Sequence, residues 1–450
     1  MKTGTNLTEG SIMKKFCLFA IPIILSGFLQ QLYNTADTIV VGRYAVDGEG
    51  ALAAVGATTS LIHLILNFFI GLSVGTNVIC ARFFGAKNND GIERALHTSL
   101  SLGIILGIPL MLVGWFFSEY FLGLMNTPPD VIKLATLYMK LYFLGVPATL
   151  IYNFGSAVLR AMGDTKRPLY ILTFSGAANV VLNLICVIVF HLDVVGVAIG
   201  TIASQIISAI AVVWIFAKGK LIPEYKLSKI KIFKNELSMI LAIGVPSGLN
   251  SILFSLSNTI TQSAVNSFGK LTVAAHSISW TFMGFCYLLI SSSEQGVISF
   301  VGQNLGAGKL QRVNKSVNCA LIFSSITVFA FSGFLLLNGA GILGIFTKDA
   351  SVVKIGLVQF YSAISMYVLY VPSVIYSGAL RGMGKGILPT IINIIGICGI
   401  RVAWVTLVWP FNPTLPMVYY SFPISWTISG IAMAIAYYIH RRKLLKLGRV

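Results

Sequence analysis

The sequence predicts an all-α membrane protein with twelve transmembrane helices, arranged as two six-helix parallel repeats (lobes) around a central cavity. Three observations carry this prediction. The 450 residues are 56% hydrophobic and 10% charged, whereas soluble proteins carry about 25% charged residues. Long apolar runs follow one another along the whole chain, and several motifs recur at a constant spacing. The short alternating segments of a membrane β-barrel are absent from the sequence.

The apolar runs set the predicted boundaries, because a helix needs about 20 apolar residues to cross a bilayer core of about 30 Å. The spans are predicted at residues 16–42, 52–80, 95–118, 130–157, 168–191, 195–217, 237–267, 272–303, 314–337, 352–378, 388–410 and 416–440. The domains are predicted as a cytoplasmic N-terminal segment, an N-lobe, a basic cytoplasmic linker, a C-lobe and a basic cytoplasmic tail, at residues 1–15, 16–217, 218–236, 237–440 and 441–450.

The net charge of +18 is distributed in a way that predicts topology rather than nucleic-acid binding. With the N-terminus inside, 25 Lys and Arg residues fall on the inner side and six on the outer side, while Arg401 lies within a span. This asymmetry follows the positive-inside rule. It predicts a multi-pass protein of the cell inner (plasma) membrane, with both termini cytoplasmic and anionic membrane lipids as contacts. The first apolar run is too long for a cleavable signal peptide, so we expect it to remain as the first span.

The two halves of the chain resemble one another. Gly85-Ala86 recurs as Gly306-Ala307, and a Leu-Arg-x-Met-Gly motif recurs at the same offset of 221 residues, beginning at Leu159 and at Leu380. A constant offset between distant motifs indicates a duplication. Six spans per half make the repeats parallel, an arrangement typical of transporters in which one lobe rocks against the other. The Leu-Arg-x-Met-Gly motifs are predicted to be cytoplasmic helix–turn–helix corners.

The first span contains a carboxylate, Asp37, within a polar stripe. Gln30, Tyr33 and Asn34 share its helix face, because they precede it at spacings of three, four and seven residues. An ionised carboxylate in hydrocarbon costs on the order of 2.5 kcal/mol or more, so such groups usually face a water-filled cavity and serve a function. The alternative is a structural hydrogen bond to a Ser or Asn of a neighbouring helix.

These motifs together resemble the multidrug and toxic compound extrusion (MATE) transporters, and more closely the DinF/MepA-like bacterial members. The resemblance rests on residues 81–87 (ARFFGAK), residues 301–309 (VGQNLGAGK), the paired Leu-Arg-x-Met-Gly motifs and Asn34-Thr-Ala-Asp37. It implies export of amphipathic, often cationic, compounds coupled to inward H⁺ or Na⁺. The coupling ion would be the only cofactor, and small molecules would be the cargo.

The resemblance also implies a cation-coupling cluster in the N-lobe. The span-1 carboxylate of the family matches Asp37, and its span-6 threonine matches Thr201. Its span-5 pattern of Asn followed by Asp falls on Asn179 and Asn183, so the second acid is replaced by an amide here. Because a Na⁺ site usually gains from two carboxylates, this replacement favours H⁺ over Na⁺. Asn153 in span 4 is a further candidate.

The C-lobe carries a second buried acid, Glu294 in span 8. It is expected either to contact a cationic drug or to pair with a base such as Arg401 or His276. Span 7 has an uncharged polar stripe that lines the cavity or bonds to neighbouring helices, formed by Ser251, Ser255, Asn258 and Gln262. The predicted substrate-binding residues are Gln30, Tyr33, Asn34, Asn153, Glu294 and Asn258.

The predicted function is a secondary active multidrug efflux antiporter with Asp37 as coupling carboxylate. The alternatives are a lipid or lipid-linked oligosaccharide flippase of the same superfamily and a non-transporting membrane scaffold. The six cysteines are isolated and the sequence has no Walker motif, so we expect no disulfide, no metal site from cysteine and no ATP hydrolysis. The chain is not expected to be an enzyme, and a monomer is the expected state.

Overall fold

The computed structural model describes residues 5–44, 48–218, 221–222 and 230–446, and these residues are helical with no strand. Eleven helices in this part of the chain are long and apolar enough to span a membrane. A twelfth span results when α4 (Pro129–Leu144) and α5 (Val146–Ala161), which meet at 44°, are taken as one broken span. The chain is therefore a multi-pass membrane protein, and the prediction of twelve spans is confirmed.

The chain divides into two units. The first comprises Met1–Asn6 and Ile21–Gly244, and the second Leu7–Ala20 and Val245–Val450. Two helices pass from one unit to the other, α1 (Ile12–Tyr44) and α8 (Lys234–Asn266). Each contains a proline directly beyond the point of division, Pro22 and Pro246, and a proline removes one bond from the helical ladder. The predicted domain boundaries stay a prediction, and parts of the N-terminal segment, linker and tail lie outside the described residues.

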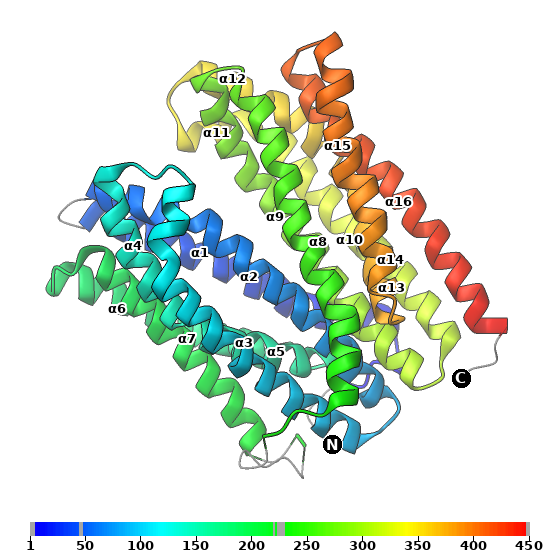
Figure 1. Cartoon of the computed structure of the whole chain (residues 1–450). Coiled ribbons are helices and arrows are strands. Elements are labelled where there is room, and N and C mark those ends of the chain that lie inside the picture. The colour runs from blue at the N-terminus through cyan, green and yellow to red at the C-terminus, as the bar shows by residue number, and fades with distance from the viewer. Residues whose placement is uncertain (1–4, 45–47, 219–220, 223–229, 447–450) are drawn as a thin grey trace. The chain divides into compact units, whose positions relative to one another are not determined.

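The first unit is built from long helices. Besides parts of α1 and α8 it contains α2 (Gly48–Gly85), α3 (Asn89–Leu124), α4, α5, α6 (Lys166–Leu184) and α7 (Asp193–Ala217). A single π-helical turn, η1 (Ile185–Val189), ends α6. Helices α6 and α7 run side by side, as do α3 and α5 (Figure 1). Asn88 caps α3 by accepting a 2.9 Å hydrogen bond from the amide of Gly91.

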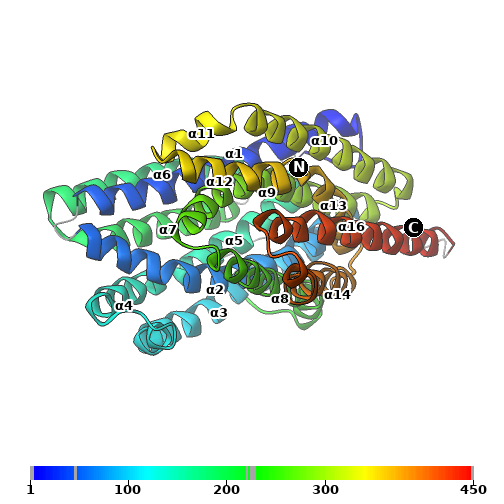
Figure 2. The same cartoon turned by 90° about the horizontal axis from the view of Figure 1, so that it is seen from above.

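The second unit has more interruptions in its helices. Besides the other parts of α1 and α8, its regular helices are α9 (Lys270–Gly306), α10 (Leu310–Leu337), α11 (Gly339–Phe346), α12 (Ala350–Gln359), α13 (Tyr370–Gly382), α14 (Ile387–Asn393), α15 (Ile400–Ala403) and α16 (Leu415–Lys446). The irregular turns are η3 (Phe360–Ile364), η4 (Tyr367–Leu369), η5 (Ile394–Gly399), η6 (Trp404–Val408) and η7 (Trp409–Phe411). Helix α16 lies along α13 within this unit (Figure 2).

The two predicted repeats have the same turn geometry. Gly163 and Gly384, which end the Leu-Arg-x-Met-Gly motifs, have φ values of 83° and 78°. Lys87 and Gly308, also 221 residues apart, have φ values of 57° and 73°. A residue in the left-handed region at this position is a common way to end a helix. The helix–turn–helix geometry of the predicted corners is therefore confirmed in each unit, and their cytoplasmic position stays a prediction.

The segment before α1 docks on the second unit. The amide of Leu7 donates to Oε1 of Gln303 at 3.0 Å, and the side chain of Leu7 is fully buried. Arg312 on α10 donates to the carbonyl oxygens of Leu7 at 3.3 Å and Gly10 at 3.1 Å, and to Oδ1 of Asn304 at 3.2 Å. One guanidinium therefore ties this segment to the ends of α9 and α10.

Replacing Arg312 by Ala is expected to lower the stability of the protein by about 1–3 kcal/mol, because the carbonyl oxygens of Leu7 and Gly10 and the side chain of Asn304 lose a charged donor. The measurement is the thermal midpoint in detergent, together with the rate at which a protease cleaves before α1. Lys315→Ala on the same helix removes an exposed cation and should leave both unchanged. Equal shifts in the two variants would contradict the role given to Arg312.

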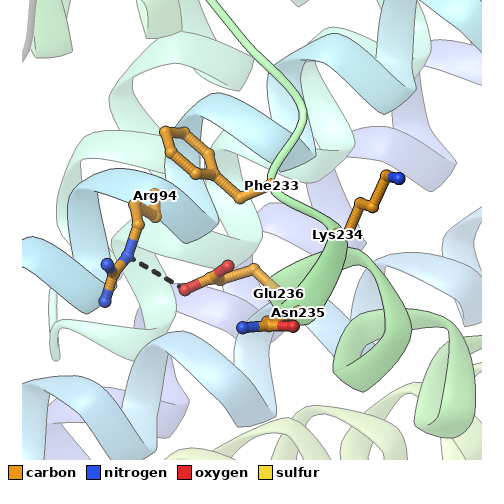
Figure 3. A pocket seen from close by; sticks show the side chains of 5 residues that line it. All are labelled: Arg94, Phe233, Lys234, Asn235 and Glu236. Carbon is orange, nitrogen blue, oxygen red and sulfur yellow. Dashed lines mark ion pairs between the residues drawn. The ribbon is translucent and has the colours of Figure 1, made fainter.

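The start of α8 is fastened to the start of α3. Figure 3 shows Arg94 and Glu236 facing one another, and their Nε and Oε1 atoms lie 3.0 Å apart. The amide of Phe233 donates to Oγ1 of Thr98 at 3.1 Å. Arg94 is about half exposed, so the ion pair itself adds only roughly 0–1 kcal/mol. Its main consequence is to fix where the basic linker enters α8.

Candidate functional site

The carboxylate predicted in the first span lies against α6. Asp37 accepts a hydrogen bond from Nδ2 of Asn183, with 2.5 Å between the two heavy atoms. Asn183 is fully buried. Asp37 forms no ion pair with a Lys or Arg within the described residues. A carboxylate and an amide are thus paired inside the first unit without a compensating positive charge.

The other two predicted coupling residues continue this contact. Nδ2 of Asn183 also lies 3.5 Å from Oδ1 of Asn179, one turn earlier on α6. Nδ2 of Asn179 lies 3.5 Å from Oγ1 of Thr201 on α7. The structure therefore brings Asp37, Asn183, Asn179 and Thr201 into one hydrogen-bonded row across α1, α6 and α7. Their role in coupling stays a prediction.

Two glycines permit the close approach of these helices. A Cβ at Gly176 on α6 would overlap the ring of Tyr33 on α1. A Cβ at Gly200 on α7 would overlap the amide oxygen of Asn183. The row of polar groups is consequently held where side chains of ordinary size would separate the helices.

The polar stripe of the first span divides into two parts. Tyr33 faces α6, since its hydroxyl donates to the carbonyl oxygen of Thr173 at 3.2 Å. Gln30 and Asn34 are exposed. Asn153 on α5 donates to its own helix, at the carbonyl oxygen of Thr149, and forms no hydrogen bond with the Asp37 row within the described residues. Substrate contact by these residues stays a prediction.

Three residues near this row were missed by sequence reasoning. Tyr138 and Tyr142 on α4 lie within electrostatic range of Asp37, and their ring centroids are 6.2 Å apart. Gln205, one turn after Thr201 on α7, has a buried Oε1 with no hydrogen-bond partner. The signal in the sequence was the i, i+4 spacing within each pair, which continues a polar face along both helices.

The second buried acid pairs with a base, which was one of the two expectations for it, but the base is neither of the two that were named; substrate contact by Glu294 stays a prediction. Oε1 of Glu294 on α9 accepts from Nη1 of Arg381 on α13 at 2.8 Å, and the two side chains are 13% and 7% exposed. The bases expected for it were Arg401 and His276. Arg381 was assigned to a cytoplasmic corner, but it lies in the last helical turn before that corner and is buried.

The remaining C-lobe candidate, Asn258 on α8, binds another residue of the protein. Its Oδ1 accepts from Nη1 of Arg401 at 2.9 Å. Arg401, which was considered as a base for Glu294, instead donates to Asn258 and Ser425, and both of these partners are neutral. His276, the other base considered for Glu294, instead forms hydrogen bonds with Gln359 and Tyr419.

The sequence pattern of the MatE family matches residues 22–185 and 246–406, which is more than half of the chain and falls in both repeats. The chain belongs to the MatE family. This confirms the resemblance on which the coupling cluster was assigned.

Relatives of this MatE chain are named as multidrug resistance or multidrug export proteins. It is 27% identical over 402 residues to the probable multidrug resistance protein YoeA of Bacillus subtilis, covering 88% of this chain and 86% of the relative. It is 23% identical over 441 residues to the multidrug export protein MepA of Staphylococcus saprophyticus, covering 97% and 96%. A crystal structure of MATE in complex with MaL6 matches with a TM-score of 0.92 at 22% identity, covering 99% of this chain and 100% of the other. The fold is that of the MATE transporters, and members of the family are transporters rather than enzymes.

Proposed function

We propose that this chain is a secondary active multidrug efflux antiporter that exports amphipathic or cationic organic compounds in exchange for inward H⁺. Alternating access would couple the two movements, and Asp37 would carry the proton. The observation that supports this most is the pairing of Asp37 with Asn183, in a buried row of amides without a basic partner. The names of YoeA and MepA support the class of cargo. A monomer in the plasma membrane with both termini cytoplasmic belongs to the same proposal.

The chemistry of Asn183 suits a site that changes its protonation. An amide group has donors on one side and an acceptor on the other. Nδ2 of Asn183 donates a hydrogen bond to the carboxylate of Asp37, while the buried Oδ1 of Asn183 has no hydrogen-bond partner. Rotating the amide would present that oxygen to the hydroxyl of a protonated Asp37. One neighbour can therefore satisfy both protonation states, which supports H⁺ as the coupling ion.

The decisive experiment is dye efflux from proteoliposomes containing the purified protein, with a pH gradient and a Na⁺ gradient imposed separately. Efflux driven by the pH gradient alone is expected. Efflux that requires Na⁺ would instead make the amide row a cation site. No efflux under either gradient, with intact protein, would overturn the proposed function and favour the flippase alternative.

Replacing Asn183 by Asp tests whether the site favours H⁺ over Na⁺ because it contains a single carboxylate, Asp37. The variant places two carboxylates in contact, and like charges at this distance hold a shared proton or attract a cation. We expect Na⁺ to raise the thermal midpoint of Asn183→Asp by several degrees and that of the parent protein by less than one degree. Asn183→Leu, which cannot ligate, is the matched control. A parent protein stabilised by Na⁺ as strongly as the variant would contradict the preference for H⁺.

A further inference from the structure

Among the described residues of the second unit, Arg401 is the most deeply buried cation, and its charge is not compensated. It lies in α15 between the π-helical turns η5 and η6 and is 1% exposed. A guanidinium inside a membrane span is expensive, stays charged and normally marks a functional site. Its Nε donates to Oγ of Ser425 at 3.2 Å and its Nη1 to Oδ1 of Asn258 at 2.9 Å. Both partners are neutral, and Nη2 is buried without a hydrogen-bond partner.

The acids of the second unit are all engaged elsewhere. This unit contains three, and each lies in the described part of the chain. Glu294 pairs with Arg381 at 2.8 Å, and Glu9 lies 3.8 Å from Nζ of Lys309. Asp349 caps α12 by accepting from the amide of Ser351. An anion that neutralises Arg401 must therefore come from outside this unit's own side chains.

Aromatic rings surround the guanidinium. Its central carbon lies 4.4 Å from the ring centroid of Phe422 and 5.4 Å from that of Phe254. Phe422 also contacts Trp426, whose Nε1 is buried and has no hydrogen-bond partner. Two unpartnered buried donors, one of them cationic, thus share Phe422 as a neighbour.

A row of rings connects this place with the surface of the unit. Tyr287 is 40% exposed and stacks on Phe254 at 6.1 Å and on Tyr370 at 6.2 Å. Tyr370 in turn stacks on Trp426 at 5.1 Å. A flat aromatic molecule that entered beside Tyr287 would meet ring faces on its way to the two donors. The π-helical turns on either side of Arg401 are of the kind often found at functional sites.

We propose that Arg401 and Trp426 form an anion subsite of the second unit, which takes the carboxylate of an aromatic organic acid or zwitterion. Arg donates to a carboxylate through a charge-assisted bond, and an indole N–H supplies a second donor. The aromatic body of the ligand packs along Phe254 and Phe422. As a cargo subsite this assignment rests on the proposed efflux function, and it specifies an anionic group on part of the amphipathic cargo.

The test compares three fluorescent probes with the same ring and chain, which are 1-pyrenebutyrate, 1-pyrenebutanol and 1-pyrenebutylamine. Each is titrated against the purified protein in detergent, without any gradient. The parent protein should bind the carboxylate at least tenfold more tightly than the alcohol. Arg401→Gln should remove this difference and leave the affinity for the alcohol within twofold. Trp426→Phe keeps an aromatic side chain but removes the N–H donor. It should lower the affinity for 1-pyrenebutyrate severalfold and leave the affinities for the other two probes unchanged.

Matched variants separate the subsite from general effects of charge or folding. Lys354→Gln removes an exposed cation of the same unit and should leave all three affinities unchanged. If Arg401→Gln does not fold, the affinities of the parent protein for 1-pyrenebutyrate and 1-pyrenebutanol still test whether the site prefers a carboxylate. Equal affinity for carboxylate and alcohol overturns the inference, and so does an equal loss of both in Arg401→Gln. Displacement of 1-pyrenebutyrate by phosphatidylglycerol but not by benzoate would also overturn it, in favour of a lipid phosphate.

The outcomes distinguish this inference from the proposed function. Selective binding of the carboxylate without efflux under any gradient would leave the anion subsite standing and remove the transport proposal. Efflux of a cationic dye under a pH gradient, with no preference for the carboxylate probe, would support the transport proposal and overturn the anion subsite.

Discussion

Asp37→Asn is expected to reduce pH-driven efflux at least tenfold, to the level of empty liposomes, while dye binding and the thermal midpoint stay close to those of the parent protein. The amide keeps the size of the carboxyl and can still accept from Nδ2 of Asn183. The amide cannot bind or release a proton, so the variant should lose the coupling step. Its fold should be retained. The measurement is dye efflux in proteoliposomes at equal amounts of protein.

Two further variants decide whether Asp37 acts as the proton carrier or only as a packing residue. Glu119→Gln removes an exposed acid from α3 in the same unit and should leave efflux intact. Asp37→Glu keeps the titrating group but moves it by about one C–C bond, so we expect slower efflux with a shifted pH profile. Full efflux activity in Asp37→Asn would contradict the role of Asp37 in coupling. A large fall in the thermal midpoint of this variant would show that Asp37 instead stabilises the fold.

The sequence was most informative where local chemistry decides the structure. The Leu-Arg-x-Met-Gly corners were predictable because a left-handed residue ends a helix in a recognisable way, and Gly163 and Gly384 supply it. The row from Asp37 to Thr201 was predictable through family resemblance, since nothing in the spacing of separate spans says which faces meet. Interhelical distances depend on side chains such as Gly176 and Gly200, whose effect emerges only when the helices pack.

The partners of buried charges could not be predicted for the same reason. The repeat places Arg160 in the first unit at the position of Arg381 in the second, and the position matching Glu294 holds Ser73. Nη1 of Arg160 accordingly donates to Oγ of Ser156 on its own helix at 3.1 Å. The Glu294–Arg381 ion pair is thus present in the second repeat and has no counterpart in the first. It becomes apparent only when α9 packs against α13.

Breaking the Glu294–Arg381 pair is expected to give the largest loss of stability, and the two single variants should differ. Glu294→Gln leaves a buried guanidinium that cannot lose its proton, and removing one partner of a buried pair costs roughly 3–5 kcal/mol. Arg381→Gln leaves a carboxyl that can become neutral by holding a proton, so its loss should be smaller at pH 5. The folded variant then binds more protons than the unfolded chain, and its stability should fall as the pH rises toward 8. Thermal midpoints in detergent between pH 5 and 8 measure both effects.

The double variant separates the loss of a favourable interaction from the exposure of an uncompensated charge. Glu294→Gln combined with Arg381→Gln leaves two neutral amides able to bond to one another, so it should recover much of the stability lost in Glu294→Gln alone. An additive loss would mean that each side chain acts through separate contacts. Equal losses in the two single variants at every pH would contradict the asymmetry between a carboxyl, which can be neutralised by a proton, and a guanidinium, which keeps its charge.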